Sequence, residues 1–152
     1  MSEAATPDKP PLKGIRGWLL LLAIAVCLAP LRTLIDLGQS AADYSRVWNV
    51  ANGKTIVLAE LAINLLLVGV EIAAVVALLG KKKSFRMTFT WLWIAAVMLP
   101  VIDVVLVASL FPQLPSGSVG AELGRAGVTF IVTGLWVWYV QTSRRVENTF
   151  TN

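Results

Sequence analysis

The sequence predicts an all-α protein, a four-helix transmembrane bundle with both termini in the cytoplasm, and three observations support this prediction. The chain has 152 residues, of which 57% are hydrophobic and only 14% are charged. A soluble domain typically carries about 25% charged residues, so the charges are too few to cover a water-soluble globule of this size. Four apolar stretches reach the roughly 20 residues that a helix needs to cross a bilayer, and most cations flank these stretches on one side.

The four predicted spans cover residues 18–37, 56–79, 87–111 and 119–140. The first and last contain arginines, whose long side chains can reach the interface from within a span. Whether the second span inserts into a bilayer can be checked by adding its transfer free energies. Its 14 Leu, Ile and Val residues between Val57 and Leu79 favour insertion by about 4 to 8 kcal/mol, against about 2.5 to 3.5 kcal/mol for one central charge. Insertion is therefore expected.

The predicted spans divide the chain into a membrane domain and two tails. Residues 1–13 are predicted as a disordered cytoplasmic tail, residues 14–143 as the membrane domain and residues 144–152 as a cytoplasmic C-terminal tail. Residues 38–55 form the longest predicted loop, in which we expect a short interfacial helix over residues 41–50. A cleavable signal peptide competes for the N-terminus, but no small-x-small cleavage site follows the apolar run, and we expect an uncleaved span.

The distribution of cations predicts the orientation. Nine of the 13 Lys and Arg residues lie in the N-terminal tail, the second connection and the C-terminal tail, which the topology places on one side. Cations are in excess on the cytoplasmic side of membrane proteins, so both ends are expected there. Trp and Tyr residues near the same side predict an interfacial aromatic belt in preference to a ligand-stacking site.

The predicted spans contain a candidate intramembrane polar cluster, whose members are Arg32, Asp36, Glu60, Asn64, Glu71, Asp103 and Arg125. Glu60, Asn64 and Glu71 are spaced along one stripe of a helix, which favours a face turned toward the other helices. No cation is predicted at the depth of Glu71, and we expect its carboxyl group to hydrogen-bond Thr129 or Thr133. Ionisable groups inside a membrane often mark a binding site or an ion path, whereas Arg–carboxylate pairs can simply hold a bundle together. Both interpretations remain open.

The residue inventory excludes several chemistries. The chain has no histidine and one cysteine, Cys27, which excludes an internal disulfide, Cys- or His-type zinc sites, histidine-based triads and haem ligation by histidine. Nucleotide fingerprints and acyl-transfer motifs are absent. We therefore expect no enzyme, no catalytic residues, no metal and no cofactor. The cations flank apolar runs instead of covering a water-exposed face, so nucleic acid is not an expected partner.

Expected partners are the lipid bilayer and, through the glycine face of the fourth span, another membrane protein or a second copy of the chain. Small residues permit close approach of helices in a membrane, and the glycines concerned are Gly120, Gly124, Gly127 and Gly134. An internal seam between helices is the alternative use of this face.

The two cytoplasmic ends carry the most specific motifs. Residues 13–20 (KGIRGWLL) and 139–150 (YVQTSRRVENTF) together resemble the bacterial YdgK-like family of small inner-membrane proteins, domain of unknown function 2569. The resemblance implies four helices, multi-pass insertion in the bacterial inner (plasma) membrane and no assigned activity. Our leading expectation is a non-enzymatic accessory or interaction protein. The alternative is a small transporter or an ion- or proton-coupled carrier that uses intramembrane carboxylates.

Overall fold

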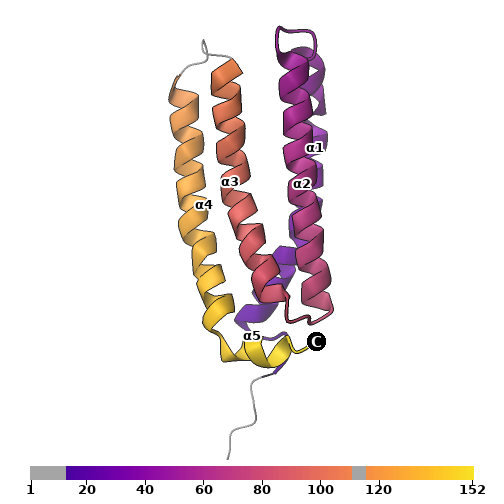
Figure 1. Ribbon diagram of the computed structural model, residues 1–152, viewed down its shortest axis with the longest axis vertical. Helices are drawn as coiled ribbons and strands as arrows, with labels where there is room; N and C mark the ends of the chain where they lie inside the picture. Colours follow the sequence, from indigo (N-terminus) through magenta and orange to yellow (C-terminus); the bar gives the residue numbers. More distant parts are fainter. Residues whose placement is uncertain (1–12, 111–115) are drawn as a thin grey trace, which may run out of the picture.

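A computed structural model describes residues 13–110 and 116–152 of the chain. It contains five helices in these ranges: α1 (Trp18–Val47), α2 (Gly53–Leu79), α3 (Phe85–Leu110), α4 (Ser116–Thr142) and the short α5 (Arg144–Thr149). The four long helices run up and down beside one another, and α5 lies across one end, which we call the α5 end (Figure 1). Each of the four is long and apolar enough to cross a membrane. The predicted all-α class and its four spans are confirmed.

The first helix extends well beyond the predicted span. It continues past residue 37 to Val47, because no proline follows Pro30 in this stretch and Ala41 and Ala42 are strong helix formers. The hydroxyl of Ser40 donates to the carbonyl of Asp36 at 3.1 Å, within the helix. The predicted separate helix over residues 41–50 is therefore wrong: most of these residues belong to α1, and the rest form a short turn into α2.

The turn between α1 and α2 brings two backbones into direct contact. Asn52 adopts a left-handed conformation with φ of 64°, and the amide of Gly53 donates to the carbonyl of Val50 at 2.9 Å. A Cβ atom on Gly53 would lie 1.8 Å from the carbonyl oxygen of Val47. Only glycine fits at this position, so α1 and α2 form a tightly closed hairpin.

The long helices pack in the order of the sequence, α1 on α2, α2 on α3 and α3 on α4. The most completely buried side chains gather near the α5 end, namely Leu19, Leu78, Phe85, Val140 and Val146. Each comes from a different helix, which gives the bundle its core at this end. Burial of α4 is the weakest, since only 6% of the residues in its spanning window are buried, compared with 28% for α1 and for α2.

Residues 144–152 pack against the bundle and join three segments at the α5 end. The hydroxyl of Thr149 accepts a 2.9 Å hydrogen bond from the amide of Gly14. The carbonyl of Asn152 accepts another, at 2.6 Å, from the amide of Lys83 in the α2–α3 turn. The ring of Phe150 stacks on that of Phe85 with centroids 4.4 Å apart and planes 17° apart. The N-terminal entry, the α2–α3 turn and the C-terminal segment therefore form one packed unit.

Candidate functional site

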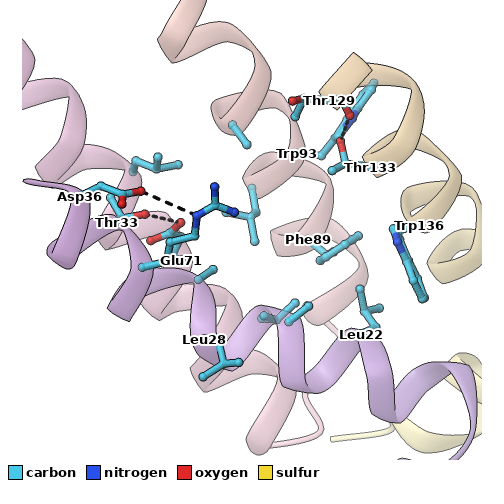
Figure 2. Close-up of a pocket in the computed structure, with 17 residues that line it drawn as sticks. Leu22, Leu28, Thr33, Asp36, Glu71, Phe89, Trp93, Thr129, Thr133 and Trp136 are labelled. Carbon is cyan, nitrogen blue, oxygen red and sulfur yellow. Dashed lines mark hydrogen bonds and ion pairs between the residues drawn. The ribbon is translucent and has the colours of Figure 1, made fainter. Parts of the chain in front are cut away.

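A cavity of about 690 Å³ lies between the four long helices. Figure 2 shows α1 and α4 on opposite sides of it, with side chains of α2 and α3 between them. Its wall is mainly apolar and includes Leu22, Phe89 and Trp136. The polar side chains on the wall come from three helices and are Arg32, Thr33, Asp36, Glu71, Thr129 and Thr133. An apolar cavity with a few convergent polar groups is typical of small-molecule sites.

Glu71 is the buried acidic group of this cavity. Its side chain comes from α2, and the residue is only 5% exposed. One carboxyl oxygen, Oε1, accepts a 3.0 Å hydrogen bond from the hydroxyl of Thr33 on α1, as Figure 2 shows. The other oxygen, Oε2, is buried and has no hydrogen-bond partner in the described part of the chain. Because an unpaired buried polar atom is energetically costly, its presence here indicates a functional role more readily than a purely structural one.

An ion pair lies on the α1 side of the same cavity. Arg32 and Asp36 are one helical turn apart, and Nε of Arg32 lies 3.7 Å from Oδ2 of Asp36. Their side chains remain 85% and 64% exposed, respectively, so the pair lies at the rim and not in the depth of the cavity. The two opposite charges balance each other, and Glu71 is left as the ionisable group that faces the interior.

The structure places Arg32, Asp36 and Glu71 of the predicted polar cluster on one cavity and its member Glu60 on another. Glu60 lines a second, smaller cavity beside Tyr44, near the α1–α2 turn. Both Glu60 and Asp103 are close enough to the hydroxyl of Tyr44 to act on it electrostatically. The side-chain amide of Asn64 donates to the backbone carbonyl of Glu60 at 2.9 Å. These residues do not line the cavity of Glu71, and Arg125 lies exposed on α4.

The expected hydrogen bond between Glu71 and Thr129 or Thr133 is wrong. The hydroxyl of Thr133 donates to the carbonyl of Thr129, inside α4, and Glu71 bonds Thr33 on the neighbouring α1. The physical reason is the packing order, since α2 is packed between α1 and α3 while α4 packs mainly on α3. Both threonines still face the cavity from its far side (Figure 2).

The tryptophans divide into two groups that the sequence did not separate. Trp18, Trp91 and Trp138 are 67%, 56% and 68% exposed, as an interfacial belt requires. Trp93 and Trp136, in contrast, line the cavity. The indole Nε1 of Trp93 is buried and has no hydrogen-bond partner among the described residues, and it would lie 3.9 Å from a Cβ atom on Gly134 of α4.

Thr33, Trp93 and Trp136 are site residues that sequence reasoning missed. A signal existed for Trp93, because it follows Phe89 by four residues and precedes Ala96 by three, the spacing of one helix face. Phe89, Trp93 and Ala96 all line the cavity. The ring of Trp93 also packs beside Gly134, where a Cβ atom would lie 3.7 Å from it. Thr33 carried no comparable signal, since isolated threonines are common in spans.

Four membrane-length helices around a polar group define the class: this is a multi-pass integral membrane protein. Within that class the chain belongs to the family described as "Protein of unknown function (DUF2569)", whose model matches residues 12–151. The match confirms the family resemblance, while the YdgK-like label rests on the end motifs alone. No curated protein and no solved structure matches the chain.

Proposed function

We propose that the protein is a small, non-enzymatic carrier of the bacterial inner membrane whose substrate binds in the cavity between the four long helices. The observation that carries this proposal is Glu71, a buried acidic residue on the cavity wall whose Oε2 has no hydrogen-bond partner among the described residues. Ionisable residues inside membrane proteins commonly mark substrate or ion pathways. A carrier is therefore favoured over an accessory role for this face of the bundle.

The depth of Glu71 supports a carrier. The residue precedes the end of α2 at Leu79 by eight positions, which corresponds to about 12 Å along the helix axis. The midpoint of α2 is Leu66, five positions or about 7.5 Å from Glu71. In a hydrocarbon core about 30 Å thick, Glu71 on a centred α2 lies within the central half, and transporters commonly bind their substrates near the middle of the bilayer. A purely structural role would be served as well by an apolar side chain, because buried charges seldom add net stability.

The cytoplasmic position of both termini is proposed from the cations. Eight of the described Lys and Arg residues lie at the α5 end: Lys13, Arg16, Lys81, Lys82, Lys83, Arg86, Arg144 and Arg145. Positive charges favour the cytoplasmic side, and the family resemblance supports a bacterial inner membrane. Green fluorescent protein fused after Asn152 is expected to fluoresce, and alkaline phosphatase fused there is expected to be inactive. Active phosphatase would refute this orientation.

Substrate binding in the cavity is testable with a neutral hydrophobic dye. Purified full-length protein is titrated with N-phenyl-1-naphthylamine, whose fluorescence rises in an apolar site. Ala96 lines the cavity, and Ala96→Phe is expected to fill part of it and to weaken dye binding about tenfold or more, a loss of about 1.4 kcal/mol. An unchanged affinity would refute the cavity as a binding site.

A matched variant shows whether weaker dye binding comes from filling the cavity or from damage to the fold. Ala73 is exposed on α2 and does not line the cavity, so Ala73→Phe should bind the dye as the original chain does. Both variants are first compared for abundance and thermal unfolding, since overpacking can cost about 1 to 3 kcal/mol. Equal losses of dye binding in the two variants would contradict the proposal.

The second candidate is the accessory or interaction role, with a second copy of the chain as the partner at α4. Gly120, Gly124 and Gly127 are exposed, and a Cβ atom on any of them would meet no atom of the described chain within 4 Å. Gly134, by contrast, packs on Trp93. The first three glycines therefore support an external contact, since small residues spaced four apart let two helices approach closely in lipid.

Self-association can be measured by energy transfer between labelled chains in liposomes. Gly124→Ile is expected to weaken association about tenfold, or 1.4 kcal/mol, by separating the helix backbones. Gly69 on α2 is the matched control, because it is also an exposed glycine with open space around it. If Gly69→Ile weakens association as much, or if the native chain remains monomeric, this second candidate is wrong.

A further inference from the structure

The ionisable side chains on the wall of the Glu71 cavity carry an excess of one acidic group. They are Arg32, Asp36 and Glu71, and the first two form an ion pair with each other. The carboxyl group of Glu71 has one oxygen bonded to the hydroxyl of Thr33 and one oxygen without a partner. No other cation lines the cavity in the part of the chain that the structure describes. A positively charged ligand would complete this arrangement.

Aromatic rings form much of the wall opposite α1. Phe89, Trp93 and Trp136 line the cavity, and the ring of Trp93 lies against Phe130 with centroids 5.0 Å apart. A cation is attracted to the face of an aromatic ring, most strongly to tryptophan, within about 6 Å of its centre. The same rings also accept the apolar body of a ligand. The carboxyl group of Glu71 and the aromatic rings therefore both favour a positively charged ligand.

The size of the cavity and its surroundings limit the ligand further. About 690 Å³ falls within the roughly 300 to 1,000 Å³ of ordinary small-molecule sites, which favours a small organic molecule over a bare metal ion. The helices α1 and α4, on its two sides, form no extended interface with each other in the described ranges. A hydrophobic molecule dissolved in the bilayer is the kind of ligand that this arrangement admits.

We infer that the cavity binds hydrophobic organic cations, with the positive charge next to the carboxyl group of Glu71 and the apolar body against Trp93 and Trp136. This inference rests on the proposed carrier function and specifies its substrate class. The Arg32–Asp36 pair at the rim contributes no net charge, so the preference for a cation depends on Glu71. Organic anions of the same shape are disfavoured by the same carboxyl group.

Two probe ions of nearly identical shape and opposite charge test the inference. Tetraphenylphosphonium is the cation and tetraphenylborate is the anion, and their binding to the purified full-length protein is measured by equilibrium dialysis. We expect the cation to bind at least about tenfold more tightly, equivalent to 1.4 kcal/mol. In Glu71→Gln, which keeps the shape of the side chain, the two affinities should differ by less than about twofold. Equal binding of the two ions by the native chain would overturn the inference.

A control at a second carboxylate makes the result specific. Glu60 lines the other cavity, near the α1–α2 turn, and Glu60→Gln changes the net charge of the chain by the same amount. It should retain the preference for the cation, and loss of the preference in both variants would overturn the role assigned to Glu71. If the neutral dye binds and Ala96→Phe blocks it while the two ions bind equally, the substrate class is wrong and the proposed function stands. If the dye also fails to bind, the proposed function itself is wrong.

Discussion

The stacked pair of Phe150 and Phe85 at the α5 end gives the most direct test of the fold. Phe150 is 4% exposed and Phe85 is fully buried, with ring centroids 4.4 Å apart. Burial of a phenylalanine contributes about 1.5 to 3 kcal/mol, and a well-placed aromatic pair adds about 0.5 to 1.5 kcal/mol. Since Phe→Ala changes in cores cost about 3 to 5 kcal/mol, we expect Phe150→Ala to lower the free energy of unfolding by about 3 kcal/mol.

Cys27 provides the assay, because it is the only cysteine in the sequence. It is partly buried against the core, so a thiol-reactive fluorophore reports unfolding when the purified protein is heated in detergent. A loss of 3 kcal/mol corresponds to a fall in Tm of about 6 to 12 °C for a chain of this length. Trp138→Ala is the control, because Trp138 is 68% exposed and its removal should shift Tm by much less. A fall below about 2 °C for Phe150→Ala, or an equal fall in the control, would refute the reasoning.

Two further predictions concern polar contact and backbone contact, and both use the same thermal assay. Thr33→Val removes the hydroxyl donor to Glu71 and should cost about 1 to 3 kcal/mol, whereas Thr33→Ser should retain most of the stability; equal effects of the two changes would contradict this. Gly53→Ala places a Cβ atom 1.8 Å from the carbonyl oxygen of Val47 and should cost about 2 kcal/mol or more. Gly69→Ala, in open space, should instead be neutral or stabilising by up to about 1 kcal/mol, and the reverse order would refute the described turn.

The spans were predictable because crossing a bilayer demands long apolar runs, and few other structures produce four of them. The extension of α1 to Val47 was not predictable from the sequence. The residues after Gly38 are polar enough to form a loop, and only the structure shows that the helix continues through them. The packing of α5 against the bundle was also not predictable from the sequence. Its buried residues Val146 and Thr149 lie in a helix of six residues, which is too short for a clear periodic pattern.

The candidate site was predictable in part, from the cost of placing an acidic group in hydrocarbon. Glu71 stood out for this reason, and the structure places it in the main cavity. Its partner did not stand out, because a helix that is apolar on all sides gives no sign of which face meets which neighbour. The assignment of Thr33 and Trp93 to the cavity depends on how α1 and α3 rotate about their axes, and the packing of whole helices decides that rotation.

The uneven burial of the helices has a consequence for handling the protein outside cells. Only 6% of the residues in the spanning window of α4 are buried, compared with 28% for α1 and for α2. Acyl chains must therefore solvate a large part of the surface of α4. Short-chain detergents, which imitate a bilayer poorly, should loosen α4 from α3 first, while the hairpin of α1 and α2 stays closed.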